Sequence, residues 1–486
     1  MTRPGTNKRR LVGLIIGPAS AGLMLVLGEP GGLDPHAWRV AALTVLMAAW
    51  WVSEALPIPV TALLPAVCLP LMGVATPEEA AAQYSNPMVM LFLGGFLIAM
   101  AVQRWGLHRR IALLILRVAG GRDDLLVAGF MLATAFLSMW VSNTATAAMM
   151  LPIGLSVIAL VESSTGETSR RLTLALLLGI AFGANIGGLG TLIGTPPNAF
   201  LAAYMAERYD FQVGFGQWML IGVPVSVTML VFAWFMLTRV SFPLPRQPIA
   251  GVADLIERER RQVGKMKPSE MRVAAIFGLT ALAWIFRPWL EGILPPWVNI
   301  SDAGIALTGA LAMFLMPAEG LRLRFLLDWE DTRTLPWGVL VLVGGGLSLG
   351  VAIESSGLAG YIASSLVGLG AWPMPVLVLV IACLAALMSH VTSNTATAAT
   401  LLPLVTSLAL QLDAHPLLFA VPVALAASAA FMLPVATPPN AIVFGSEKIT
   451  VPDMVRAGIG LTIGGALLAT AAAFLVAPWL FGFSVN

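Results

Sequence analysis

The sequence predicts an all-α polytopic membrane protein, with about eleven transmembrane helices and two re-entrant hairpins arranged in two inverted-topology repeats. Three observations support this fold class. Charged residues are scarce, long apolar runs recur along the whole chain, and a pair of polar motifs occurs twice in the same order. The first two observations indicate a helical membrane protein, and the third indicates the repeat.

The composition excludes a soluble globular protein. Of 486 residues, 58% are apolar and 11% are charged, whereas an ordinary soluble protein carries roughly 25% charged residues. The apolar runs are continuous rather than alternating with polar residues, so a membrane β-barrel is excluded and helices remain. A net charge of +2 gives no sign of a nucleic-acid partner. The sequence shows neither a nucleophile–base pair nor a metal-ligand motif, so we expect no enzyme activity and no organic cofactor.

The apolar runs define the expected spans. They lie near residues 11–27, 37–53, 57–74, 87–104, 173–204, 214–238, 272–289, 302–316, 336–353, 417–445 and 457–482. Two further apolar stretches, 125–160 and 372–412, are each interrupted by a polar cluster. Because each half is too short to cross a hydrocarbon core of roughly 30 Å comfortably, we interpret both stretches as re-entrant hairpins.

The distribution of basic residues predicts the orientation. Lys and Arg are concentrated at the N-terminus, after the fourth span and in the long polar loop 239–272. The loops near 28–36, 75–86 and 290–301 contain neither. Since basic loops stay in the cytoplasm, the sequence predicts a multi-pass protein of the inner (cytoplasmic) membrane, surrounded by the lipid bilayer. Its N-terminus is expected in the cytoplasm and its C-terminus outside.

An internal repeat divides the chain. SNTATAAMMLPI begins at Ser142 and SNTATAATLLPL begins at Ser393, and the motifs GTPPNAF and ATPPNAI follow them at 194–200 and 436–442. The expected division is an N-terminal repeat 1–240 (hairpin near 125–160, broken helix near 194–198), a cytoplasmic connector 241–271, and a C-terminal repeat 272–486 (hairpin near 372–412, broken helix near 436–440). The two hairpins enter from opposite sides, which is typical of secondary transporters with a midplane binding site.

The repeated motifs suit the binding of an anion together with a cation. Ser, Asn and Thr cap helix N-termini, whose free N–H groups attract anions, and the oxygens of the same turn can ligate a small cation. A residue before Pro is biased away from helix, so Thr195 and Thr437 should break their spans. A single SNT is more often a local cap or a helix–helix hydrogen bond. The duplication favours a binding role. Because the motifs contain no Lys or Arg, an anion there would need helix dipoles, hydroxyls and bound cations for neutralisation, which favours cation-coupled uptake.

One residue of the second hairpin has no polar counterpart in the first. His390 corresponds to Met139 at an offset of 251 residues. Histidine titrates near physiological pH, so His390 is either a proton sensor or, as we favour, a polar residue near the hairpin tip.

With both motif pairs in hand, the whole chain resembles the divalent-anion/sodium symporter family. The resemblance implies a homodimer in which a fixed scaffold and a mobile transport unit are interleaved across both repeats, with the transport unit moving as an elevator. It implies a small dianionic substrate, a C4-dicarboxylate such as succinate, malate or fumarate, or in some members citrate or sulfate, carried with Na⁺.

The resemblance also implies which residues form the sites. One sodium site would use Ser138, Ser142, Asn143 and the Gly194 carbonyl, and the other would use Ser389, Thr392, Asn394 and the Ala436 carbonyl. The substrate carboxylates would contact Asn143, Thr144, Ser393, Asn394 and Thr395, while Thr195, Pro196, Thr437 and Pro438 would close the pocket.

Several transport modes are compatible with these motifs. Exchangers of the family tend to lose sodium-site residues, and both SNT triplets are intact here, so we favour symport over a Na⁺-independent dicarboxylate exchanger. A tricarboxylate or sulfate carrier and an anion channel are the further alternatives. Two Na⁺ make the uptake of a dianion only electroneutral, and the sequence offers no clear ligand set for a third cation.

Overall fold

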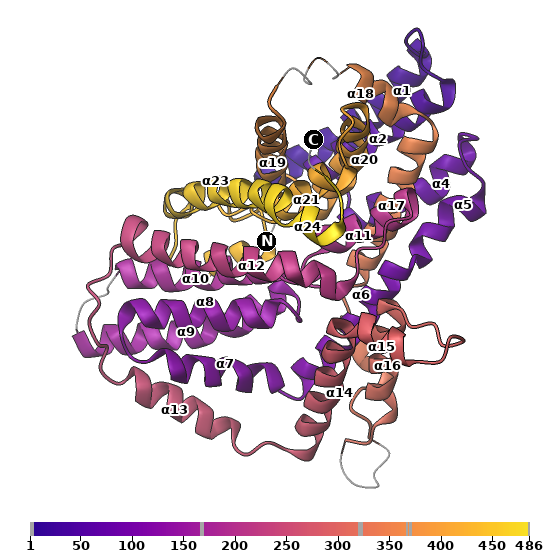
Figure 1. Ribbon diagram of the computed structural model, residues 1–486. Coiled ribbons are helices and arrows are strands. Elements are labelled where there is room, and N and C mark those ends of the chain that lie inside the picture. The colour runs from indigo at the N-terminus through magenta and orange to yellow at the C-terminus, as the bar shows by residue number, and fades with distance from the viewer. Residues whose placement is uncertain (1–3, 166–169, 319–323, 366–367, 369–371, 485–486) are drawn as a thin grey trace.

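The computed structural model describes residues 4–165, 170–318, 324–365, 368 and 372–484. Within these ranges the chain is helical, with two isolated β-bridges and no β-strand, as Figure 1 shows. The all-α membrane fold that the composition predicts is therefore confirmed.

The first half of the chain contains fourteen helical elements. They are α1 (Pro4–Leu27), α2 (Pro35–Ser53), α3 (Ile58–Thr61), α4 (Leu64–Leu71), α5 (Pro77–Ala82), η1 (Gln83–Ser85), α6 (Pro87–Arg104), α7 (Leu107–Ala119), α8 (Asp123–Ser138), α9 (Asn143–Thr165), α10 (Arg170–Gly188), α11 (Pro196–Tyr209), α12 (Phe215–Phe235) and the π-helical turn η2 (Met236–Ser241).

The second half follows a similar order after the connecting helix α13 (Val252–Val263). Its elements are α14 (Pro268–Ile285), α15 (Arg287–Ile293), α16 (Asp302–Leu315), η3 (Trp329–Thr334), α17 (Trp337–Ser355), α18 (Leu358–Ser365), α19 (Met374–Ser389), α20 (Asn394–Gln411), α21 (Pro416–Ala427), α22 (Pro438–Phe444), α23 (Val451–Leu475) and α24 (Ala477–Phe481).

The number of spans differs from a simple count of apolar runs. Among the described residues, 7 helices are long and apolar enough to cross a membrane, or up to 8 when the pair α14 and α15, bent by 80°, is counted as one span. Several expected spans consist of shorter pieces: 57–74 contains α3 and α4, 173–204 contains α10 and α11, and 417–445 contains α21 and α22. Prolines and extended residues divide these runs, so the count of eleven remains a prediction.

The two expected hairpins are helix pairs joined by short turns. Residues 139–142 connect α8 to α9, and residues 390–393 connect α19 to α20. The arms are unequal: α9 has 23 residues, with Pro152 inside it, and is long enough to cross a membrane by length and composition. The re-entrant arrangement of 125–160 therefore stays a prediction.

A helix begins at each TPPN motif, after a non-helical break. Helix α10 ends at Gly188 and α11 begins at Pro196, after the extended residue Thr195 (φ −144°, ψ 138°). Thr437 is extended in the same way before α22 (φ −142°, ψ 150°). The ring of the following proline disfavours a helical conformation at the preceding residue, and proline itself fits the first turn of the helix that resumes.

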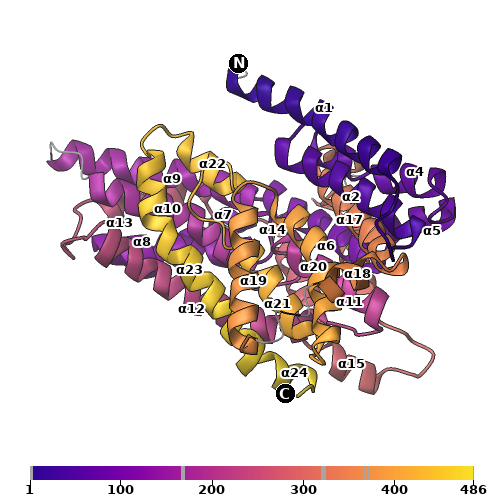
Figure 2. The ribbon, with the colours of Figure 1, turned by 90° about the horizontal axis from the view of Figure 1, so that it is seen from above.

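The packed helices form two buried apolar clusters. The larger one draws side chains mainly from α2, α6, α11, α16, α17 and α19–α21, and the smaller one from α7–α10, α12, α22 and α23. Figures 1 and 2 show α1, α2, α4 and α5 at one end of the molecule and α7–α10 with α13 at the other. The repeated motifs lie between these ends.

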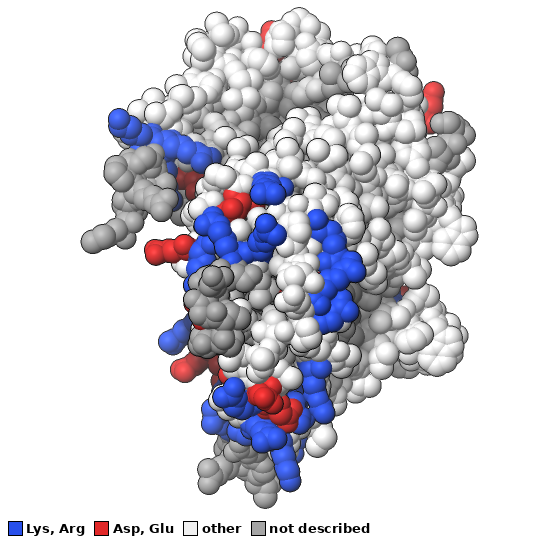
Figure 3. All heavy atoms as spheres, turned by 90° about the vertical axis from the view of Figure 1, so that its left-hand side faces the viewer, with Lys and Arg blue, Asp and Glu red and all other residues white. Residues whose placement is uncertain are grey.

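Charge is concentrated on one face. Figure 3 shows Lys and Arg gathered on the left-hand side of Figure 1, where helices α8, α9, α10 and α13 reach the surface. Helix α13 lies in the segment expected as the connector and is held to α7 by an Arg109–Glu259 ion pair. A hydrogen bond from Arg260 lowers the pKa of Glu257 to about 2, so the Glu257 carboxylate is ionised at physiological pH.

Candidate functional site

A cavity of about 580 Å³ lies where α9, α11, α20 and α22 begin. The nine residues expected to contact the substrate all line it: Asn143, Thr144, Thr195, Pro196, Ser393, Asn394, Thr395, Thr437 and Pro438. The fold thus brings together four turns that are far apart in the sequence. Four helix N-termini meet at one space, and the positive ends of their dipoles attract anions. Backbone N–H groups in the first two positions come from α9 and α20 only, because α11 and α22 begin with two prolines.

The first hairpin tip is held by two side-chain hydrogen bonds. The buried Ser138 hydroxyl lies 2.5 Å from Asn143 Oδ1. Ser142 Oγ accepts a hydrogen bond from the Ala145 N–H at 3.3 Å, as an N-cap does. These contacts fix the amide of Asn143 at the edge of the cavity.

The second tip repeats both contacts at an offset of 251 residues. Ser389 Oγ lies 2.6 Å from Asn394 Oδ1, and Ser393 Oγ accepts from the Ala396 N–H at 3.1 Å. Ser389 Oγ also lies 2.5 Å from the Ala427 carbonyl oxygen. A hydroxyl has one proton and can satisfy only one of the two acceptors, so three oxygen atoms crowd together at this tip.

The expected sodium ligands divide into three groups. Ser142, Asn143, Gly194, Asn394 and Ala436 line the cavity. Ser138 and Ser389 are fully buried, and each hydrogen-bonds to an asparagine that lines the cavity, Asn143 or Asn394. Thr392 does not line the cavity, because its hydroxyl bonds to the Thr397 hydroxyl at 2.7 Å and to the Met388 carbonyl at 3.0 Å. Among the described residues, the Thr392 hydroxyl therefore bonds to the neighbouring ends of α19 and α20 and is not directed to the cavity.

Glycine at the first break allows a close approach to Asn143. A Cβ atom on Gly188 would lie 2.9 Å from the Gly194 carbonyl oxygen and 3.0 Å from the Asn143 side-chain amide. The Gly194 carbonyl is therefore close to the Asn143 side chain, as the expected sodium site requires.

The asparagines of the TPPN motifs hold the break loops together. Asn198 Nδ2 donates to the carbonyl oxygens of Gly188, Leu189 and Thr191 at 2.8–3.3 Å. Asn440 Nδ2 donates to those of Ala430 and Leu433 at 3.2 and 3.0 Å. No role is predicted for these two asparagines from the sequence, although their duplication in the TPPN motifs is a signal for one.

Hydrogen bonds also join the two breaks to each other. Thr195 Oγ1 lies 3.1 Å from Ser428 Oγ, and Asn185 Nδ2 donates to Thr437 Oγ1 at 3.0 Å and to Asn440 Oδ1 at 3.1 Å. Asn185 also lines the cavity. The sequence carries no signal for Asn185 or Ser428, because their repeat counterparts are Ala427 and Ile186.

The opposite wall of the cavity comes from α6 and from the start of α17. Phe92, Phe96 and Gln103 belong to α6, while Thr334 and Val339 lie around the start of α17. The sequence motifs did not indicate these residues. The described residues that line the cavity include no Lys, Arg, Asp or Glu, so its polarity comes from amides, hydroxyls and backbone groups.

The surroundings of His390 favour the structural interpretation. The ring is buried, with Nδ1 lying 2.7 Å from the Ala386 carbonyl oxygen and Nε2 accepting from the Met432 N–H at 3.1 Å. A carbonyl partner requires a proton on Nδ1, and an N–H partner requires a lone pair on Nε2. Both bonds are satisfied by one neutral tautomer, which joins the hairpin tip to the second break loop.

A helical membrane fold with two motif-bearing hairpins around one cavity defines the class of secondary transporters. Residues 8–483 match the family model described as the sodium:sulfate symporter transmembrane region. The chain belongs to this family, which is the divalent-anion/sodium symporter family that its motifs resemble.

Curated relatives cover nearly the whole chain. A protein named sodium-dependent dicarboxylate transporter SdcS from Staphylococcus aureus (strain USA300) is 40% identical over 486 residues, which cover 98% of this chain and 93% of the relative. SdcS from Staphylococcus saprophyticus is also 40% identical, over 489 residues, with 99% and 94% covered.

Solved structures share the fold at low sequence identity. The YdaH transporter of Alcanivorax borkumensis has a TM-score of 0.58 and 16% identity, with 89% of this chain and 97% of that chain covered. MtrF of Neisseria gonorrhoeae has a TM-score of 0.58 and 15% identity, with 96% and 98% covered. At these identities the likeness concerns the fold alone.

Proposed function

We propose that the protein is a secondary active transporter that takes up C4-dicarboxylates such as succinate, malate and fumarate together with Na⁺. The observation that carries the proposal is the duplicated Ser–Asn contact, Ser138–Asn143 and Ser389–Asn394, on two sides of one cavity. The curated relatives named as sodium-dependent dicarboxylate transporters support the same function.

The sodium ions bind next to the two asparagines. At the first tip the ligands are Ser138, Ser142, Asn143 and the Gly194 carbonyl. At the second they are Ser389, Asn394 and the Ala436 carbonyl, with the Ala427 carbonyl in place of Thr392, whose hydroxyl is engaged elsewhere. A hard cation prefers such oxygen ligands, and the crowded oxygens at Ser389 would be relieved by a positive charge between them.

The dicarboxylate lies between the two tips. One carboxylate meets the N-terminus of α9 with Asn143 and Thr144, and the other meets the N-terminus of α20 with Asn394 and Thr395. Thr195 and Thr437 close the pocket at the breaks. Since no basic side chain lines the described cavity, helix ends and bound Na⁺ provide the positive potential for the dianion.

The motif-bearing helices move as one transport unit in this proposal. The α8–α9 and α19–α20 hairpins and the broken helices form the mobile part in both repeats, and α6 and α17 belong to the scaffold that supplies the opposite wall. The protein works as a homodimer in the inner membrane. Its basic face (Figure 3) and its N-terminus lie in the cytoplasm, and its C-terminus lies outside. We expect no catalytic activity.

Uptake into proteoliposomes tests the proposal. Labelled succinate should accumulate when an inward Na⁺ gradient is present and should not accumulate when choline replaces Na⁺. Equal uptake in both conditions would overturn the sodium coupling. Uptake that depends instead on internal dicarboxylate would identify an exchanger, and a saturating competition panel with citrate and sulfate separates the dicarboxylate carrier from the other family specificities.

A further inference from the structure

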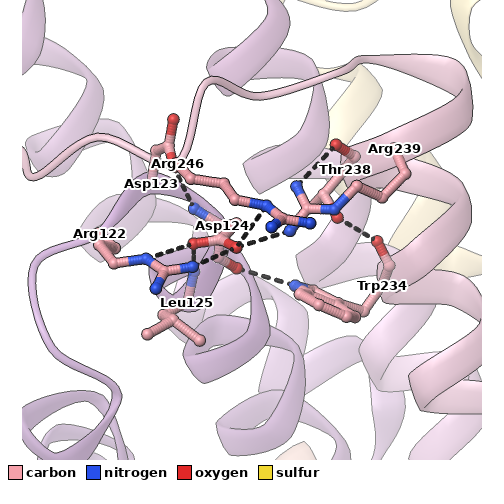
Figure 4. Close-up of polar contacts among 8 residues, drawn as sticks. All are labelled: Arg122, Asp123, Asp124, Leu125, Trp234, Thr238, Arg239 and Arg246. Carbon is pink, nitrogen blue, oxygen red and sulfur yellow. Dashed lines mark hydrogen bonds and ion pairs between the residues drawn. The ribbon is translucent and has the colours of Figure 1, made fainter.

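A compact arginine cluster lies at the base of the first hairpin, away from the transport cavity. The Asp124 carboxylate is 1% exposed, and its Oδ2 lies 2.9 Å from Arg122, 2.7 Å from Arg239 and 4.0 Å from Arg246. Figure 4 shows the three guanidinium groups surrounding this single carboxylate. They come from the start of α8, from η2 and from the loop that follows η2.

The cluster carries more positive than negative charge toward its outer side. The neighbouring Asp123 is buried, and its carboxylate accepts the Asp124 N–H at 2.7 Å. The side chains of Arg122 and Arg246 are 44% and 61% exposed. One buried carboxylate therefore holds three guanidinium groups in place while two of them retain N–H donors that face outward.

The surrounding backbone holds the arginines in position. Asp123 N–H donates to the Gln247 carbonyl at 3.1 Å, and Ile249 N–H donates to the Gly121 carbonyl at 2.8 Å. Trp234 Nε1 donates to the Asp124 carbonyl at 2.9 Å, and the Arg239 guanidinium lies 5.3 Å from the Trp234 ring centroid. Because these segments are tied together, an anion would meet a nearly preformed site.

Apolar surface leads away from the cluster on two helices that pack together. Helix α8 exposes Leu125, Leu132 and Phe136, and helix α12 exposes Val227, Val231 and Phe235. The spacings of seven and four residues on α8, and of four and four on α12, place each set on one face of its helix. The arginine cluster lies at the end of both apolar faces, on the side of the molecule where basic residues gather (Figure 3).

We propose that an anionic phospholipid of the leaflet at the basic face binds here. Its phosphate lies between Arg122 and Arg246, and its acyl chains run along the exposed faces of α8 and α12. Guanidinium groups recognise phosphate well, and basic clusters beside membrane helices attract anionic lipids. The lipid binds to the base of the hairpin whose tip carries Asn143, so it stabilises the position of α8 against α12.

The test compares the lipid affinity of purified variants. Delipidated protein in detergent is titrated with phosphatidylglycerol, and bound lipid is counted by native mass spectrometry. Arg246→Gln should weaken phosphatidylglycerol binding about fivefold, since each arginine near an anionic surface contributes about 1 kcal/mol. Arg122→Gln combined with Arg246→Gln should weaken it further. Arg246 is the milder variant because its contact with Asp124 is the longest.

Arg258→Gln on α13 is the matched control. Arg258 is exposed on the same side of the chain and bonds only through its Nε to the Asp254 carbonyl among the described contacts, so phosphatidylglycerol affinity should not change. Equal affinity in all variants, or equal binding of phosphatidylcholine, would overturn the proposal. Inorganic phosphate that displaces phosphatidylglycerol at millimolar concentration would also overturn it, because the site would then recognise the free ion rather than a lipid.

Discussion

The two hairpin tips share one polar framework and differ in what surrounds it. The Ser–Asn contact and the serine cap occur in both. Around the second tip, Thr392 bonds to Thr397 and His390 bonds to the Met432 N–H. Around the first, the counterparts are Val141 and Met139. The common contacts fix the asparagine and the helix start at each tip, and the remaining contacts hold the two tips in place in different ways.

The different surroundings leave two buried side-chain oxygens of the first half unpaired among the described residues. Within the described part of the chain, the buried Thr146 Oγ1, the counterpart of the Thr397 hydroxyl, has no hydrogen-bond partner. The buried Asn198 Oδ1 has none there either, whereas its counterpart Asn440 Oδ1 accepts from Asn185. The first half relies on close packing of glycines, with Met139 against Gly190 and Asn143 near Gly188. The second half relies on side-chain hydrogen bonds. The comparison therefore predicts that equivalent substitutions have unequal effects.

Removal of either asparagine should have the largest effect and should affect both halves alike. Asn143→Ala or Asn394→Ala deletes a proposed sodium ligand. Asn143→Ala also removes the acceptor of the buried Ser138 hydroxyl, whereas Ser389 keeps the Ala427 carbonyl. A hydrogen bond to a charged group contributes about 1.5–3 kcal/mol, so Na⁺-driven succinate uptake should fall at least roughly tenfold, to near background, with normal expression. The exposed Asn299→Ala is the control. Normal uptake in both variants would refute the site.

The first break should be less tolerant of a methyl group than the second. A Cβ atom on Gly194 would clash with the Gly188 carbonyl oxygen, while the counterpart Ala436 already carries one. Overpacking costs about 1–3 kcal/mol, so Gly194→Ala should raise the sodium concentration for half-maximal uptake roughly tenfold. Ala436→Gly should change it by less than about threefold. The comparison fails if both substitutions have the same effect.

The substitution His390→Met gives the second tip the residue that the first tip has at the corresponding position, Met139. The Met432 N–H would lose its acceptor, and an unpaired buried donor costs about 1–3 kcal/mol, so the midpoint of thermal unfolding in detergent should fall. Because the two ring bonds hold a neutral tautomer, the pH profile of uptake between about 5.5 and 8, normalised to its maximum, should stay unchanged. A shifted profile would instead identify His390 as a proton sensor.

The smallest expected effect is a gain in stability. Val141→Thr places a hydroxyl where Thr392 has one and offers a partner to Thr146, so the protein should become more stable by about 0.5–1 kcal/mol. Thr392→Val should have the opposite effect through Thr397. Thermal unfolding of both variants measures how much the hydroxyl–hydroxyl hydrogen bond stabilises each tip. A loss of stability in Val141→Thr would show that the tips are not interchangeable at this position.

The sequence predicted the features that are local or repeated. Ser–Asn pairs within one turn, N-caps and X-Pro breaks depend on neighbouring residues, so the starts of α9, α11, α20 and α22 follow from the motifs alone. Features that depend on contacts between distant segments were not predictable. Asn185 and Ser428 have only apolar repeat counterparts, Ala427 and Ile186, and the wall from α6 carries no motif. The orientation of Thr392 is decided by its bond to Thr397, and the length of α9 by the helix that continues through Pro152.

The bonds between the breaks, Thr195 to Ser428 and Asn185 to Thr437, have a consequence for the history of the chain. Two copies of a duplicated segment usually diverge independently, because each is selected for its own contacts. Here each break hydrogen-bonds to a polar residue of the other repeat, Ser428 or Asn185, whose own counterpart is apolar. A substitution at Thr437 therefore removes a hydrogen-bond partner of Asn185, although 252 residues separate the two in the sequence. A change in one repeat thus alters the selection on residues of the other, and the two repeats must diverge together.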